Sequence, residues 1–258
     1  MRTFSLRYLV VAMKLSNAYT IAKYIMLSSR HWIYVSVGFT LIFPALWLTL
    51  LRIIGNPQYM GYFIVGTVVN TSFLIPFIGT SQDIAYFRRS SAIYTLMFSN
   101  GAGHWDIALG YITQLIILNL PSIVSLLILS ILITNAAYRA VQVLATVAVA
   151  VFISLSSALL GYALGMGIKN YRIVNQVAQI IPWPLLLLAP VYYPITVLPP
   201  VLRYISLTLP TTYMALAING SLSLNASELV RGILGLLAYS SASILIARYA
   251  VIRGEVNG

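Results

Sequence analysis

Long apolar stretches dominate the chain, and polar residues gather in short segments between them. A helix needs about 20 mostly apolar residues to cross a bilayer. The strands of membrane barrels alternate apolar and polar positions, whereas these stretches are continuous. Six qualify, at residues 32–51, 59–80, 108–134, 141–167, 174–194 and 230–252. The pattern predicts an all-α membrane protein with six transmembrane helices, the fifth distorted by Pro182-Trp183-Pro184.

The composition supports the same class. Of 258 residues, 60% are hydrophobic and only 7% are charged, whereas soluble domains carry about 25% charged residues. The absence of cysteine excludes disulfides, zinc–thiolate sites and thiol catalysis. The first apolar run, at residues 8–13, is short and closed by Lys14, so we expect no cleavable signal peptide. We expect residues 1–258 to form one transmembrane domain in the cell membrane.

Basic residues predict the orientation of this domain. With a cytosolic N-terminus, eleven of the 15 Lys and Arg residues fall on the cytosolic side. Only Arg52, Arg139, Arg203 and Arg231 fall outside. Because cytosolic loops carry an excess of Lys and Arg, both termini are predicted to be cytosolic. The net charge of +11 reflects this loop bias, and we expect no nucleic-acid partner.

Residues 1–30 mix regularly spaced cations with aromatic and aliphatic residues. This pattern predicts an amphipathic helix in the cytosolic interface, with its cations near anionic lipid headgroups. A loosely structured basic leader is the alternative. Residues 31–258 would then form the six-span bundle.

Ionisable groups are almost absent from the predicted spans. Asp83 and Asp106 flank a cytosolic segment, and the two histidines, His31 and His104, lie near the cytosolic edge. Ion-coupled transporters and membrane enzymes need titratable or metal-binding groups in the interior. The chain also lacks the glycine loop G-x-x-x-x-G-K-[ST] that binds nucleotides. We expect no enzyme activity and no cofactor, so that energy for any pumping comes from a partner.

Amide and hydroxyl side chains are the polar groups left in the spans. They can hydrogen-bond between helices, or they can line a substrate path. They are Asn70, Thr71, Gln114, Asn119, Gln176 and Gln179.

A half-polar segment, RRSSAIYTLMFSNGAGHWDI at residues 88–107, interrupts the apolar pattern between spans two and three. Residues 88–101 predict a short helix that Ser90 or Ser91 caps and that Gly101 and Gly103 end. Its apolar side chains lie at helical spacing, and exposed apolar patches often mark docking surfaces. An amphipathic loop lying on the bilayer is the alternative.

This segment and its continuation to residue 110 resemble the cytosolic signature of type-2 exporter permeases of ATP-binding-cassette (ABC) transporters. That signature is approximately R-x-x-G-T-L-E-x-L-L-x-T-P-V-S-R-W-E-I-x-L-G. Met97 and Phe98 match its Leu pair, residues 105–107 match W-E-I, and Gly110 matches the last Gly. Thr95 stands where the family has Glu, and Asn100-Gly101 replaces Thr-Pro.

A second segment, PVYYPITVLPPVLRYISLTLPTTY at residues 190–213, resembles the extracellular re-entrant signature of the same family. Prolines at 199 and 200 can start one helix, and Pro210 can end it and start another. Irregular backbone at membrane depth needs protein or a water-filled path around it, so such a pair can form an outer gate. An aromatic belt on the surface is the alternative.

The resemblance implies a permease subunit that pairs with a second permease copy or paralogue and binds separate ATPase subunits, which hold the ATP and Mg²⁺. Membrane lipids surround it. The implied ATPase-coupling residues are Arg88, Arg89, Ile93, Tyr94, Met97, Phe98, Asn100, Gly101 and His104. The implied outer-gate residues are Tyr192, Tyr193, Pro194, Leu198, Pro199, Pro210 and Tyr213.

Two other function classes fit the sequence less well. A membrane scaffold or assembly factor could use the same cytosolic helix for docking, without transport. A secondary transporter conflicts with the charge-poor interior. That interior fits drugs, lipids or lipid-linked glycans better than small ions as the transported substrate.

Overall fold

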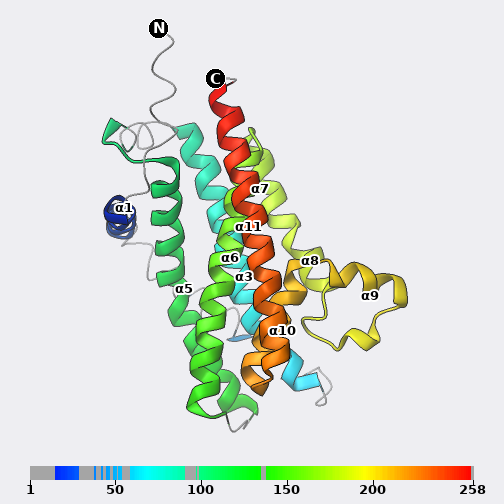
Figure 1. The fold of residues 1–258 in the computed structure, drawn as a ribbon. Coiled ribbons are helices and arrows are strands. Elements are labelled where there is room, and N and C mark those ends of the chain that lie inside the picture. Colours follow the sequence, from blue (N-terminus) through cyan, green and yellow to red (C-terminus); the bar gives the residue numbers. More distant parts are fainter. Residues whose placement is uncertain are drawn as a thin grey trace.

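The structure is a computed structural model, and all the regular elements that it describes are helices (Figure 1). The described residues are 15–28, 38, 42, 45–46, 49–50, 52–53, 59–90, 97, 99–134 and 138–256.

Four long helices form the bundle: α3 (Met60–Ser90), α5 (His104–Thr134), α6 (Ala140–Gly167) and α11 (Ala226–Val256). Each is long and apolar enough to cross a membrane. They correspond to four predicted spans, and three of them extend beyond the predicted limits by several residues. The protein is therefore a multi-pass membrane protein, with four such helices in its described part, or up to five if a bent pair counts as one.

The other two predicted spans have different outcomes. Most of 32–51 lies outside the described residues. The predicted span 174–194 is instead two short helices, α7 (Tyr171–Ile180) and α8 (Pro182–Leu188), followed by a loop. Pro182 and Pro184 lack the N–H groups that would continue the helical hydrogen bonds, although Ile181 itself keeps an α-helical backbone (φ −58°, ψ −40°). The distortion expected from these prolines is thus an interruption of hydrogen bonding.

The segment after α8 leads sideways from the bundle, through η3 (Ile195–Val197) to α9 (Pro200–Leu207) (Figure 1). α10 (Pro210–Ser223) then turns by 81° from α9 and runs antiparallel to α11. Gly220 approaches the backbone of Leu229 near one end of this pair. At the other end, the Tyr239 hydroxyl donates to the carbonyl of Thr208. Because Tyr239 lies near the middle of α11, α10 reaches only about half the length of its neighbour.

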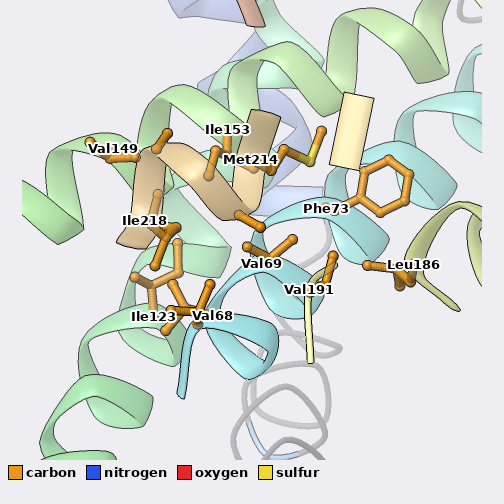
Figure 2. Close-up of a cluster of buried hydrophobic side chains, with 14 of the residues drawn as sticks. Val68, Val69, Phe73, Ile123, Val149, Ile153, Leu186, Val191, Met214 and Ile218 are labelled. Atoms are coloured by element: carbon orange, nitrogen blue, oxygen red, sulfur yellow. The ribbon is translucent and has the colours of Figure 1, made fainter. Parts of the chain in front are cut away.

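Close contact between α3 and α6 forms the centre of the bundle. A Cβ added to Gly165 would lie 2.8 Å from the carbonyl oxygen of Ser81, and one added to Gly161 would collide with the carbonyl of Phe77. Small residues permit such backbone approach between membrane helices. Figure 2 shows the buried cluster beside this contact, where Val69 and Phe73 of α3 meet Ile153 of α6 and Met214 of α10. The short helix α10 is therefore part of the core.

The N-terminal helix α1 (Leu15–Ser28) lies across α5 instead of along it (Figure 1). A Cβ on Gly110 would lie 2.6 Å from Ile21 Cγ2 and 3.0 Å from the carbonyl oxygen of Ala18, so the two helices touch closely at this glycine. Tyr19, Tyr24 and Leu27 on α1 are exposed. Of the interface helix predicted for residues 1–30, the part at 1–14 lies outside the described residues.

Candidate functional site

The start of α5 is fixed by Asp106, which is almost fully buried. Its Oδ2 accepts a hydrogen bond from the backbone N–H of Gly103, at 3.1 Å. This is the bond that an acidic residue at the third helical position makes to the capping residue. The same oxygen accepts a bond from Asn17 Nδ2 of α1, at 3.2 Å. One carboxylate thus caps α5 and holds α1 in place.

The turn before α5 packs against the same two helices. Gly101 has φ +79°, a left-handed conformation that glycine adopts readily, as the sequence predicts for the end of the preceding helix. The N–H of Ala102 donates to the carbonyl of Met97, at 3.0 Å. Ala102 is buried with Ile21 of α1 and Tyr111 of α5, and Met97 packs against this cluster.

A groove of about 510 Å³ opens between α1 and this turn. Its walls combine apolar side chains with amides and a hydroxyl. They are formed by Asn17, Thr20, Ile21, Tyr24, Met97, Asn100 and Ala102. We name α1, the groove, Met97 and residues 99–106 the coupling site, because four of the predicted coupling residues lie there: Met97, Asn100, Gly101 and His104, which is the first residue of α5.

The remaining predicted coupling residues are distributed differently. Arg88 and Arg89 belong to the last turn of α3, so the predicted helix start at residue 88 is wrong. The sequence turns polar at residues 80–83, yet α3 continues through them, so the change in polarity does not mark the end of this helix. Ile93, Tyr94 and Phe98 lie outside the described residues.

Arg88 joins α3 to the end of α6. Its guanidinium donates to the carbonyl oxygens of Gly165 and Met166, at 3.0 and 2.9 Å. The last carbonyls of a helix lack backbone partners, and a cation there also interacts favourably with the helix dipole. Nearby, the ring of Trp105 in α5 packs against that of Tyr162 in α6, with centroids 5.4 Å apart and the planes inclined by 44°. The coupling site is thereby connected to α3, α5 and α6.

Sequence reasoning missed Asn17 and did not explain Gly110. Asn17 is an ordinary polar residue in the sequence, and its partner lies 89 positions away. Gly110 was noted as the last glycine of the cytosolic signature, and the structure shows that it lets α1 approach α5.

Replacing Asp106 with Ala is expected to loosen α1. The change removes the cap of α5 and the acceptor for Asn17, and loss of a cap costs about 0.5–2 kcal/mol. Hydrogen exchange of the α1 amides should become faster, by about tenfold for a loss of 1.4 kcal/mol. Asp106→Asn, which keeps an acceptor oxygen, serves as the control. Unchanged exchange in the Ala variant would show that α1 does not depend on this carboxylate.

The predicted outer-gate residues all lie in residues 189–213, which we name the outer segment, and they make different contacts. Tyr192 contacts α3, where Asn70 Nδ2 donates to its hydroxyl at 3.0 Å. Tyr193 donates to the carbonyl of Leu187, and the Tyr213 hydroxyl donates to that of Leu207 at 3.0 Å. Pro194, Leu198 and Pro199 flank η3 and α9, and Pro210 is the first residue of α10.

Two of the interior amides hydrogen-bond to another segment of the bundle, which is the first of the two roles that the sequence predicts for them. Asn70 binds Tyr192, and Asn119 Nδ2 of α5 donates to the carbonyl of Thr71 on α3 at 3.2 Å. By contrast, Gln176 and Gln179 are exposed on α7.

Comparison with known proteins identifies the class to which this arrangement belongs. The family model of the ABC-2 type transporter matches residues 21–222, which includes both signature-like segments and most of α1. A search of curated proteins found no match. Because the family model covers most of the chain, this multi-pass membrane protein belongs to the ABC-2 type transporter family and is an ABC transporter permease.

Proposed function

We propose that the chain is the permease subunit of an ATP-driven exporter, forming the substrate path while separate ATPase subunits bind ATP and Mg²⁺. Family membership supports the permease role. The sequence carries no nucleotide-binding glycine loop, which supports a separate source of energy.

The distribution of cations supports a cytosolic position for the coupling site. Arg88, Lys169 and Arg172 lie at the ends of α3, α6 and α7 that meet near this site, and Arg248 lies towards the same end of α11. At the opposite end of the bundle, Arg139 caps α6 and Arg231 follows the start of α11. Following the positive-inside rule, we propose that the coupling site and both termini lie in the cytosol.

The observation that carries the proposal is the packing of α1 and the 97–102 turn on the start of α5. An ATPase subunit that binds this surface would contact α1 and the turn, which pack on the buried cluster below them. Movement of the turn would reach α5 through the hydrogen bond between Gly103 and Asp106. The Arg88 contacts offer a second route, from α3 into α6. We propose that α1 lies in the cytosolic interface beside lipid headgroups, and that two permeases pair so that each binds one ATPase subunit.

We further propose that α9 and α10 form a re-entrant pair that closes the outer end of the path. The support is geometric: α10 starts level with the middle of α11, and the pair bends by 81°. Both ends of α10 are held. Gln142 of α6 donates to the carbonyl of Leu222 at 2.5 Å, and Thr211 donates to the carbonyl of Leu185 in α8.

Purification of the membrane complex and reconstitution in liposomes tests this function. We expect an ATPase subunit to co-purify, and the proteoliposomes to move amphiphilic drugs or lipids when ATP is present on the coupling side. Flux that follows a proton or sodium gradient without ATP would instead identify a secondary transporter. Partner binding with no flux would favour a membrane scaffold.

A further inference from the structure

Tyr192 lies in a slot on α3 that only a small residue can provide. A Cβ added to Gly66 would lie 2.9 Å from Tyr192 Cγ and closer still to the ring edge. Glycine within a helix is unfavourable relative to alanine, so its presence here needs a packing reason. The tyrosine ring supplies that reason.

The slot also has a polar end. Asn70 follows Gly66 by four residues, which places the two on the same face of α3, one turn apart. The ring therefore lies over Gly66 while its hydroxyl accepts the hydrogen bond from Asn70 Nδ2, at 3.0 Å. Gly66 and Asn70 together fit a tyrosine in both shape and polarity.

The segment that carries Tyr192 is short and is attached mainly through side chains. The N–H of Val191 donates to the carbonyl of Ala189 at 2.8 Å, a tight turn around Pro190. Val191 is fully buried beside Val69 and Phe73 of α3, as Figure 2 shows. By contrast, α10 and α11 approach closely through backbone at Gly220 and at Gly232, and the Tyr213 ring packs on Gly235. Of these two contacts, we expect the one between residues 189–194 and α3 to separate more easily than the one between α10 and α11.

From this geometry we infer that Tyr192 keeps the outer gate closed by binding to α3. Gly66 and Asn70 form the slot that holds its ring and its hydroxyl in the closed state. The inference rests on the proposed function, because it assumes that the outer segment closes a transport path. Opening would release a neutral hydrogen bond, the partly buried ring of Tyr192 and the buried side chain of Val191, but no charged pair, which would hold more strongly. Opening separates residues 189–194 from α3, while α10 and α11 stay together.

Disulfide trapping tests this directly, because the natural chain contains no cysteine. In Gly66→Cys/Tyr192→Cys, the Cβ atoms lie no more than about 4.4 Å apart, since the added Cβ is 2.9 Å from Cγ and one bond separates Cγ from Cβ. This suits a disulfide. The ring is absent from this variant, so the new side chain at 66 has room.

A matched control exists in the α10–α11 pair. The ring of Tyr213 lies against Gly235 in the same way that the ring of Tyr192 lies against Gly66. Tyr213→Cys/Gly235→Cys should therefore cross-link equally well in every state, because these two helices move together.

The measurement is the yield of cross-linked chain in the permease–ATPase complex, without nucleotide and with a non-hydrolysable ATP analogue and Mg²⁺. We expect the 66/192 yield to be high without nucleotide and to fall at least about fivefold with the analogue, while the 213/235 yield stays constant. Three results would overturn the inference: an unchanged 66/192 yield, no 66/192 cross-link in any state, or an equal fall in both pairs. Failure of the proposed function looks different, because then no ATPase subunit co-purifies at all.

Discussion

Replacing Met97 with Asp is expected to weaken the binding of the ATPase subunits strongly. Met97 packs against the buried cluster of Ile21, Ala102 and Tyr111 and lines the groove beside α1. A carboxylate there is poorly solvated and lacks a cationic partner among these neighbours, so the turn and α1 should separate. Loss of a central contact of this kind costs about 2 kcal/mol, or roughly 30-fold in affinity.

The measurement is the amount of ATPase subunit that co-purifies with the permease from membranes. Met97→Leu is the matched control, because it keeps the apolar volume and should bind like the natural protein. The family resemblance predicts the same loss of binding for Phe98→Asp. A Met97→Asp protein that inserts stably and still binds its ATPase subunits would refute the role of this turn in coupling.

Replacing Gly161 with Leu is expected to have the largest effect on stability. The added Cβ would collide with the backbone carbonyl of Phe77 and lie 3.0 Å from Ser81 Oγ. Backbone cannot move aside as a flexible side chain can, so α3 and α6 must separate. Overpacking of this kind costs about 1–3 kcal/mol or more.

Thermal unfolding in detergent provides the measurement, and the midpoint should fall clearly for Gly161→Leu. Gly167→Ala, at the end of the same helix, is the control, because a Cβ there meets nothing within 4 Å. An unchanged midpoint for Gly161→Leu would show that the two helices are not in close contact there.

The long helices could be predicted because apolar length alone specifies them. Four predicted spans agree with α3, α5, α6 and α11 to within about four residues at each end, except that α3 continues to Ser90, ten residues beyond its predicted end. The ends were less predictable, since helices at a membrane surface continue into polar sequence. Arg88, for example, reads as the start of a cytosolic segment, yet it lies in α3 because its charge is satisfied by the carbonyls at the end of α6.

Contacts between distant segments could not be predicted from one sequence. Nothing local indicates that Gly66 makes room for Tyr192, or that Asn17 binds Asp106. The family model covers both signature-like segments, and Gly110, Asp106 and Pro210 within them have structural roles. The distortion predicted for the span at 174–194 lies where the prolines are, between α7 and α8, but the helix ends at Leu188, earlier than predicted.

The central claim is that the coupling site faces the cytosol and binds the ATPase subunits. Thiol labelling from one side of the membrane tests it most directly. Asn100→Cys places a thiol on the exposed turn before α5, and Ser223→Cys places one at the opposite end of the bundle. We predict that a membrane-impermeant thiol reagent labels Asn100→Cys only in inside-out vesicles, that ATPase subunits protect it, and that Ser223→Cys is labelled only in right-side-out vesicles. Labelling of Asn100→Cys from the outside, or labelling that the ATPase subunits leave unchanged, would contradict the account.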